Sequence, residues 1–240
     1  MVQSEKNRAV KMGNKINGTL VILTLNEIEG LKKIFPLIPA KGIGEVFAVD
    51  GGSTDGTLDF YKKNRVRVLK QVSKGRGEAF RIAIKHAKYD NLVFFSPDGN
   101  ENPDDILKLF SCLGHGYDVA IASRFMKNGR CDEDNKLIKF RKFGNKMFTL
   151  LANIAFNGKL TDSINGFRGI TKEAFKKINP DASGFGIEFQ VSMRALKNKM
   201  RIAEIPTVES ERIGGRSTAG SFNVGSYFIK LLVKEIFNKK

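Results

Sequence analysis

A run of acceptor side chains follows a short apolar segment near the middle of the chain. Residues 92–95 read Leu-Val-Phe-Phe, and the chain continues at once with Ser96, Pro97, Asp98, Gly99, Asn100 and Glu101. A buried strand that ends here would place carboxylate and amide oxygens at the carboxyl edge of a sheet, where open α/β sheets bind their ligands. Such oxygens suit a hard divalent cation, which commonly serves a phosphate. The alternative is an ordinary Pro-Asp-Gly turn and helix cap, because the same residue types are common in turns.

The composition is that of a basic, soluble globular chain. The 240 residues fit one domain and carry a formal net charge of +16. Such a surface attracts phosphorylated substrates, anionic lipid headgroups or nucleic acid, and it can also serve solubility alone. With only His86 and His115, the chain gives little support to a histidine-rich metal site or a Ser-His-Asp triad. Cys112 and Cys131 form no disulfide framework, so we expect reduced thiols in a cytosolic protein.

Neither a membrane span nor a secretory signal is evident. No stretch reaches the roughly 20 apolar residues that a span requires. The first 17 residues have no apolar core, and we expect them to form a basic, flexible lead-in.

Apolar, β-branched runs alternate with helical patterns through the first half of the chain. The runs predict strands at residues 19–25, 44–50, 66–71, 91–95 and 119–123, and the helical patterns include residues 57–63, 74–88 and 103–113. This alternation with short connections predicts an α/β fold with a mostly parallel sheet flanked by helices. Each strand ends in polar or small residues, so we expect a carboxylate-lined crevice along one edge of the sheet.

The second half is less regular. Residues 125–139 are charged and mixed, which favours an exposed loop. Further patterns predict a helix at residues 142–157, a strand at 166–170, a helix at 188–197 and a strand at 201–205. Residues 226–238 form an amphipathic helical pattern that either lies on a membrane or closes the domain by packing.

Seven motifs in one order carry a family resemblance. They are LTLNE (23–27), VDGGSTDGT (49–57), KGRGEA (74–79), SPDGNENP (96–103), ASRF (122–125), DSINGFRGI (162–170) and ERIGGRS (211–217). Together they resemble family two glycosyltransferases of the GT-A fold, nearest to the dolichyl-phosphate mannose synthase-like, or polyprenyl-phosphate sugar transferase, branch. The resemblance implies a Rossmann-like domain at residues 18–221, with a nucleotide-sugar half at 18–124 and an acceptor half at 125–221. An amphipathic helix at 222–240 would follow it.

The resemblance also implies a nucleotide site at the first strand ends and the Lys-Gly-x-Gly loop. In this sequence its members are Thr24, Asn26, Glu27, Asp50, Gly75, Arg76 and Gly77. Asp50 would accept hydrogen bonds from the base or ribose, or cap its own turn. The two glycines would let the backbone approach a phosphate at a helix start. Arg212 and Arg216 lie on a Gly-rich loop that would close over the diphosphate.

The family's DxD metal motif is altered in this chain. Its aligned residues are Ser96, Pro97 and Asp98, so Asp98 takes the metal-ligating position and Asn100 falls where an amide oxygen can join it. Ser96 cannot contribute a negative charge. We therefore expect a Mg²⁺ or Mn²⁺ cofactor that is weakly bound or partly replaced by basic side chains.

On the acceptor side, the resemblance assigns Arg124, Arg168 and, less securely, Arg141 to an acceptor phosphate, since guanidinium forks match phosphate oxygens. A phosphate acceptor is already an anionic nucleophile and needs no general base. The role of Asp162 stays open, and Glu188 is either structural or catalytic.

These features predict an inverting transferase that moves a hexose from GDP-mannose or a UDP-sugar to a polyprenyl or dolichyl phosphate. We expect a cytoplasmic protein bound peripherally at the cytoplasmic membrane face, with a membrane surface or a small membrane-anchoring protein as partner. A glycan or protein hydroxyl is the alternative acceptor, with Glu188 or Asp162 as base. A second alternative is a catalytically degenerate binding subunit. Nucleic acid is not an expected partner, because the chain lacks a docking module and interleaved aromatic platforms.

Overall fold

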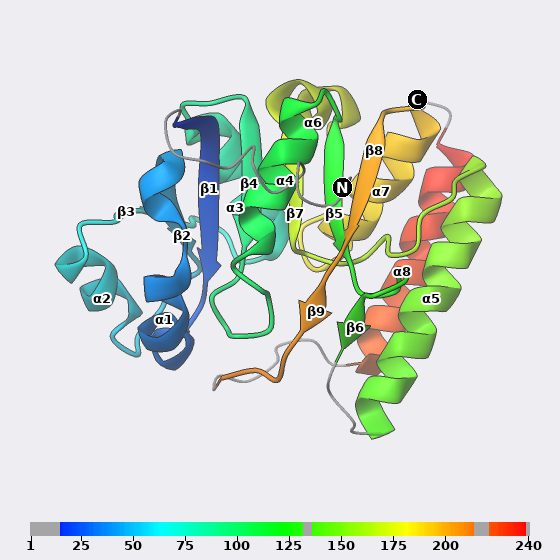
Figure 1. Ribbon diagram of the computed structural model, residues 1–240. Helices are drawn as coiled ribbons and strands as arrows, with labels where there is room; N and C mark the ends of the chain where they lie inside the picture. Colours follow the sequence, from blue (N-terminus) through cyan, green and yellow to red (C-terminus); the bar gives the residue numbers. More distant parts are fainter. Residues whose placement is uncertain (1–14, 132–135, 214–220, 239–240) are drawn as a thin grey trace, which may run out of the picture.

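A seven-stranded sheet forms the centre of the molecule (Figure 1). The computed structural model describes residues 15–131, 136–213 and 221–238. In chain order the strands of this sheet are β1 (Ile16–Thr24), β2 (Ile43–Asp50), β3 (Arg67–Lys70), β4 (Asn91–Phe95), β5 (Val119–Ser123), β7 (Arg168–Thr171) and β8 (Ile202–Pro206). Their spatial order is β3-β2-β1-β4-β7-β5-β8, and every pairing is parallel except those of β7 with β4 and β5. The predicted α/β fold with a mostly parallel sheet is confirmed.

The register brings the carboxyl ends of the first strands together. Thr24 pairs with Asp50 at the ends of β1 and β2, and Ile22 pairs with Phe95 at the end of β4. The loops that follow these three strands therefore start side by side at one edge of the sheet.

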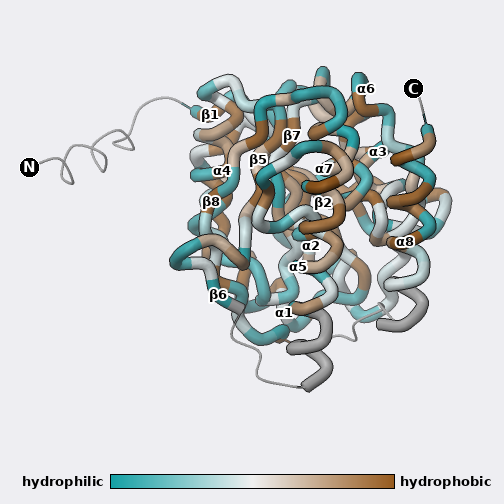
Figure 2. The backbone as a smooth tube through the Cα atoms, turned by 90° about the vertical axis from the view of Figure 1, so that its right-hand side faces the viewer, coloured by the Kyte–Doolittle hydropathy of each residue, from teal (hydrophilic) through white to brown (hydrophobic). Residues whose placement is uncertain are grey.

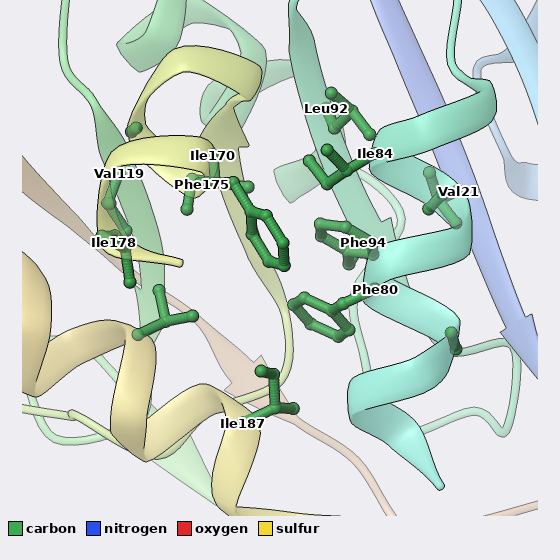
Figure 3. Close-up of a cluster of buried hydrophobic side chains, with 14 of the residues drawn as sticks. Val21, Phe80, Ile84, Leu92, Phe94, Val119, Ile170, Phe175, Ile178 and Ile187 are labelled. Carbon is green, nitrogen blue, oxygen red and sulfur yellow. The ribbon is translucent and has the colours of Figure 1, made fainter. Parts of the chain in front are cut away.

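Helices cover both faces of the sheet, and the alternation of side chains along each strand separates two cores. On one face, Leu20 and Ile22 pack with α1 (Ile28–Ile34), α2 (Thr57–Lys63) and α4 (Asp105–Gly114). On the other face, Val21 and Leu23 pack with α3 (Arg76–His86), α6 (Lys172–Ile178) and α7 (Gly186–Lys197). Figure 3 shows this second core, in which the ring of Phe80 stacks on that of Phe94 with 3.8 Å between centroids.

Two further helices form an outer layer on α7. They are α5 (Lys136–Phe156) and α8 (Ser221–Phe237), which lie side by side at the right of Figure 1. A third apolar cluster joins them to α7, with Phe148 from α5, Phe189 from α7 and Phe228 from α8 in mutual ring contact. The Glu235 carboxylate of α8 also accepts hydrogen bonds from Arg194 of α7, at 2.8 and 2.9 Å.

The structure corrects two boundaries expected from the sequence. The charged segment at 125–139 is not one long loop, because β6 (Arg130–Cys131) pairs with β9 (Val208–Glu209) and α5 begins at Lys136. The C-terminal helix spans Ser221–Phe237, so it begins one residue before the helix expected at 222–240 and five residues before the amphipathic pattern at 226–238.

This helix carries apolar residues on its exposed side as well as on its buried side. It buries Phe228, Leu231 and Leu232 against α5 and α7, yet Ile229, Val233, Ile236 and Phe237 are exposed. Figure 2, which views this side of the molecule, shows apolar residues (brown) along its visible turns. Within the described ranges, no helix has the length and apolarity to cross a membrane.

Candidate functional site

A cavity of about 670 Å³ lies beyond the carboxyl end of β4 and reaches between α5 and α8. One part of its lining is polar and charged: Arg76, Ser96, Asp98, Asn100, Glu101, Arg124, Glu188 and Glu209. The other part is largely apolar: Phe143, Met147 and Phe148 from α5, Ile164, Phe185, and Phe228 and Ile229 from α8. The cavity therefore suits a ligand, or a pair of ligands, with an anionic group next to an apolar chain.

The loop after β4 is fixed by hydrogen bonds from two sides. Within the loop, the backbone N–H of Ser96 donates to Oε2 of Glu101 at 2.7 Å, and that of Asn100 donates to Oδ1 of Asp98 at 3.1 Å. From the segment after β9, the N–H of Ser210 donates to the carbonyl of Asn100, and that of Ile213 to the carbonyl of Asp98. The oxygen-bearing side chains are thus held in place before any ligand arrives.

Arg76 and Glu188 form an ion pair in the cavity wall. Arg76 is the first residue of α3 and also reaches the hydroxyl of Ser96, with 3.4 Å between Nη1 and Oγ. Glu188, in the first turn of α7, is only 3% exposed, and its Oε2 has no hydrogen-bond partner within the described structure. A buried carboxylate oxygen of this kind is left available for a ligand donor.

A second arginine of the cavity is held by two carboxylates. Arg124 grips Asp162 with its Nε and Nη2 at 2.7 and 3.1 Å, and its Nη1 lies 3.5 Å from Glu209. Asp162 is fully buried and also accepts the N–H groups of Ile164 and Asn165. Both Asp162 oxygens are therefore used within the protein.

Arg212 bridges Glu27 and Asp98. It hydrogen-bonds Oε1 of Glu27, and its Nη2 lies 3.4 Å from Oδ2 of Asp98. Burial raises the pKa of Glu27 to about 7, opposed by Arg212 and reinforced by the nearby charge of Asp98. The other oxygen of Glu27 and the Nε of Arg212 are buried without a hydrogen-bond partner among the described residues.

The surroundings of Glu101 and Glu209, near Asp98, disfavour the ionised form of both side chains. Burial raises the pKa of Glu101 well above its usual range, and the charge of Asp98 raises it further, while Arg76 opposes both. Burial also raises the pKa of Glu209, against the effect of Arg124. Crowded, buried acids of this kind favour the arrival of a cation.

The residues at this position fit a divalent cation in part. Oδ1 of Asn100 is buried and finds no hydrogen-bond partner in the described part of the chain, and it belongs to the same short loop as the Asp98 carboxylate. An amide oxygen and a carboxylate are suitable ligands for Mg²⁺ or Mn²⁺. In residues 15–131, 136–213 and 221–238, no group of three or more His, Cys, Asp or Glu side chains is placed so that it could hold a metal ion. The remaining ligands would come from substrate phosphates and water.

Three expected nucleotide-site residues lie at the sheet edge outside the cavity lining. Asp50 is fully buried and accepts the backbone N–H groups of Gly52 and Ser53, each at 2.9 Å. Asn26 receives the N–H of Thr54, and Thr24 is 6% exposed at the end of β1. In this structure Asp50 and Asn26 organise the turn after β2.

The two glycines of the Lys-Gly-x-Gly loop face the protein's own chain. A Cβ on Gly75 would lie 2.2 Å from the carbonyl oxygen of Ser183, and one on Gly77 would lie 2.0 Å from that of Ala182. The N–H of Gly77 donates to the Ser183 carbonyl at 2.9 Å. The close approach that was expected to admit a phosphate is made here by the segment before α7.

Arg168 is placed differently from the expectation. It is fully buried and donates to the carbonyls of Asn165 and Glu188, each at 2.8 Å, and to the hydroxyl of Ser192. Burial lowers its pKa to about 10. This placement does not support a contact with an acceptor phosphate, because the guanidinium is used to hold the 163–165 turn against α7. Arg216 and the side chain of Arg141 lie outside the described residues.

Several lining residues had no role in the sequence interpretation. Glu101 lies within the SPDGNENP motif, but the family resemblance implies no role for it, and Glu209 lies in a two-residue strand outside the seven motifs. Phe143 and Met147 lie in the helix expected at 142–157, but helical periodicity indicates packing more often than a ligand, and Phe185 precedes α7 without any such pattern.

The family model described as glycosyl transferase family 2 matches residues 19–179. Glycosyltransferase AglJ of Haloferax volcanii is 27% identical over 198 residues, covering 81% of this chain and 63% of that protein. Polyprenol monophosphomannose synthase of Mycolicibacterium smegmatis is 28% identical over 229 residues, covering 89% of this chain and 85% of that protein. Dolichol-phosphate mannosyltransferase of Pyrococcus furiosus is 27% identical over 209 residues, covering 83% and 58%. The chain thus spans less than two thirds of the first and the third of these relatives.

Solved structures agree on the fold. Glucosyl-3-phosphoglycerate synthase from Mycobacterium tuberculosis, in complex with Mg²⁺ and UDP, superposes with a TM-score of 0.72 at 22% identity, covering 97% of this chain and 83% of that one. The GT-A architecture expected from the seven motifs is confirmed. Because the family model matches well over half of its length, the chain belongs to glycosyl transferase family 2.

Proposed function

We propose that the protein transfers a hexose from a nucleotide sugar to a polyprenyl phosphate. The observation that carries this proposal is the two-part cavity, where basic and acidic side chains adjoin an apolar wall from α5 and α8. A nucleoside diphosphate and a lipid phosphate need the polar part, and an isoprenoid chain needs the apolar part. The names of the Mycolicibacterium and Pyrococcus relatives, a polyprenol monophosphomannose synthase and a dolichol-phosphate mannosyltransferase, support this acceptor class.

Asp98 and Asn100 would hold a divalent cation at the donor end of the cavity. Bound there, the cation would supply Lewis-acid stabilisation of the departing nucleoside diphosphate. The solved relative with Mg²⁺ and UDP supports such a cofactor. Arg212 lies against Asp98 and adds a positive charge that the diphosphate can take up.

At the acceptor end, Arg76 and Arg124 would receive the lipid phosphate. A phosphate oxygen attacks the anomeric carbon, the bond from that carbon to the diphosphate oxygen breaks, and the nucleoside diphosphate leaves with the electron pair. Attack from the face opposite the leaving group inverts the anomeric configuration. The nucleophile is already an anion, so no side chain has to remove a proton.

The outer helices are suited to a membrane surface. The exposed apolar residues of α5 and α8 repeat at helical spacing, forming one stripe on each helix: Phe143, Met147, Leu150, Leu151 and Ile154, and Ile229, Val233, Ile236 and Phe237. Exposed Lys146 and Lys230 belong to the same helices. Apolar stripes with flanking lysines favour peripheral binding to anionic lipid. We therefore place the protein at the cytoplasmic membrane face, where the lipid phosphate lies close to the cavity mouth.

The test is transfer of radiolabelled sugar from GDP-mannose, UDP-glucose or UDP-N-acetylglucosamine to a polyprenyl phosphate in detergent with Mg²⁺ or Mn²⁺. Label that passes into the organic phase with one donor, and is lost with Asp98→Asn, is the expected result. Binding of nucleoside diphosphate without lipid-linked product from any of these donors would contradict the proposed acceptor.

A hydroxyl acceptor is the second candidate, and the free Oε2 of Glu188 favours it. Of the two bases considered from the sequence, Asp162 is occupied by Arg124 and backbone N–H groups, whereas Glu188 lines the cavity. If Glu188 is a general base, Glu188→Gln should abolish transfer to a glycan, and the loss should be relieved at high pH only for acceptors that ionise.

A further inference from the structure

Glu101 is a buried carboxylate with no counter-ion of its own. It is 7% exposed, and no lysine or arginine in the described part of the chain makes an ion pair with it. Arg76, a basic side chain in the same cavity wall, is paired with Glu188. An ionised carboxylate is costly to bury unless a cation compensates it.

Its position relates it to the altered metal motif. Ser96 stands where the motif would have its first aspartate, and the backbone N–H of Ser96 donates to Oε2 of Glu101 at 2.7 Å. Residue 96 has no carboxylate of its own, but the carboxylate of Glu101 is hydrogen-bonded to the backbone N–H of this residue. Ser96, Asp98, Asn100 and Glu101 all line the same cavity.

A separate observation points to a cation at this place. Oδ1 of Asn100 is buried without a hydrogen-bond partner in the described structure, between Asp98 and Glu101 in sequence. The backbone N–H of Asn100 donates to Asp98 and its carbonyl accepts from Ser210, whereas its side-chain Oδ1 is buried without a partner among the described residues. A carbonyl-type oxygen next to carboxylates is a ligand that Mg²⁺ and Mn²⁺ accept readily.

We propose that Glu101 is the second carboxylate of the cation site and replaces the aspartate that Ser96 does not provide. With Asp98 it supplies two negative charges for a divalent ion, and Asn100 supplies a neutral oxygen. This inference rests on the proposed function, because it gives the donor site its cation.

The variant Glu101→Gln tests the charge alone, since the glutamine oxygen can still accept the N–H of Ser96. Binding of Mn²⁺ is measured by electron paramagnetic resonance, with Mn²⁺ alone and with GDP or UDP added. We expect Glu101→Gln to weaken Mn²⁺ binding by about 10- to 100-fold. Adding Ser96→Asp to Glu101→Gln should restore it, because the charge returns to the usual position. Asp98→Asn should abolish binding, which identifies the site.

Glu45→Gln is the matched control. Glu45 also accepts a backbone N–H at 2.7 Å, from Lys88, but it lies near the start of β2, at the opposite edge of the sheet. This variant should bind Mn²⁺ like the wild type. Melting temperatures of all variants establish that each is folded under the conditions of the titration.

Wild-type affinity in Glu101→Gln, together with loss of binding in Asp98→Asn, would overturn the inference and leave Glu101 as a cap for Ser96. So would calorimetry that shows GDP or UDP binding equally well with and without Mn²⁺, and in that case the proposed transfer could still stand. Failure of both nucleotides to bind the wild-type protein at all would count against the proposed function itself.

Discussion

Glu27 offers a direct test of the electrostatics at the nucleotide edge of the sheet. Its carboxylate is 8% exposed, and burial raises its pKa from 4.5 to about 7, with Arg212 opposing and Asp98 reinforcing the change. Each pKa unit corresponds to about 1.4 kcal/mol, so ionisation of Glu27 lowers the free energy of unfolding, and hence the stability, by about 3 kcal/mol. Between pH 4.5 and 7 the folded state binds more protons than the unfolded state at this group, and its contribution to stability falls as the pH rises.

The perturbation is Glu27→Gln, which stays neutral at every pH. Urea unfolding of both proteins between pH 4 and pH 8.5 should show that the variant gains about 3 kcal/mol relative to the wild type across this range. The other carboxyls with raised pKa values, Glu101, Glu204 and Glu209, are present in both proteins, so their effects cancel in the difference. Glu29→Gln on the exposed side of α1 is the control and should show no such slope. A difference between Glu27→Gln and wild type that is flat with pH would refute the reasoning.

Three further predictions concern the framework of the site. Arg168→Ala should destabilise the protein by about 3 kcal/mol or more in urea unfolding, because it removes the buried guanidinium that donates to the carbonyls of Asn165 and Glu188; a loss below about 1 kcal/mol would contradict this. The pKa of Asp181 is about 2: burial by itself would raise it, but hydrogen bonds from Lys234 and Gln190 lower it. The ionised Asp181 therefore stabilises the folded protein above pH 3.8, and this contribution is lost as the pH falls toward 2. Asp181→Asn should therefore reduce acid sensitivity, by less than about 1 kcal/mol since the pair is half exposed; equal acid unfolding curves would count against the contact. Ile154→Glu should weaken flotation with anionic vesicles about tenfold without changing nucleotide affinity, because a side chain that is 72% exposed is removed from the apolar stripe; unchanged flotation would argue for another docking face.

The fold was largely predictable because buried parallel strands leave a strong mark in the sequence. The apolar runs that became β1, β2, β4 and β5 are nearly continuous, as burial on both faces requires. The direction of β7 was not predictable in the same way. Its residues, Arg168–Thr171, show no feature in the sequence that distinguishes an antiparallel from a parallel neighbour.

The candidate site was predictable where a loop follows a strand, and less so where partners come from distant segments. Asp98 and Asn100 follow β4 directly and line the cavity as expected. The same reasoning placed Arg168 at the acceptor phosphate, yet its side chain is fully buried in the protein. A sequence motif does not reveal on which side of a turn a side chain will lie. Glu209 reaches the cavity only through the pairing of β9 with β6, which joins residues nearly 80 positions apart.

The distribution of charge in the site differs from what a net charge of +16 suggests. The arginines in or beside the cavity are already paired with carboxylates: Arg76 with Glu188, Arg124 with Asp162 and Glu209, and Arg212 with Glu27 and Asp98. A phosphate that binds here has to exchange partners with a carboxylate rather than fill an empty basic pocket. A free anion would bind weakly by such an exchange, because the carboxylate that loses its arginine stays buried without a counter-ion. Asp98 is the residue that would hold a divalent cation, and if it did so, Arg212 would be free to pair with the phosphate. We therefore expect the acids among the arginines to favour a metal–diphosphate pair over a free anion, and the excess of lysine on the surface to attract anions at longer range.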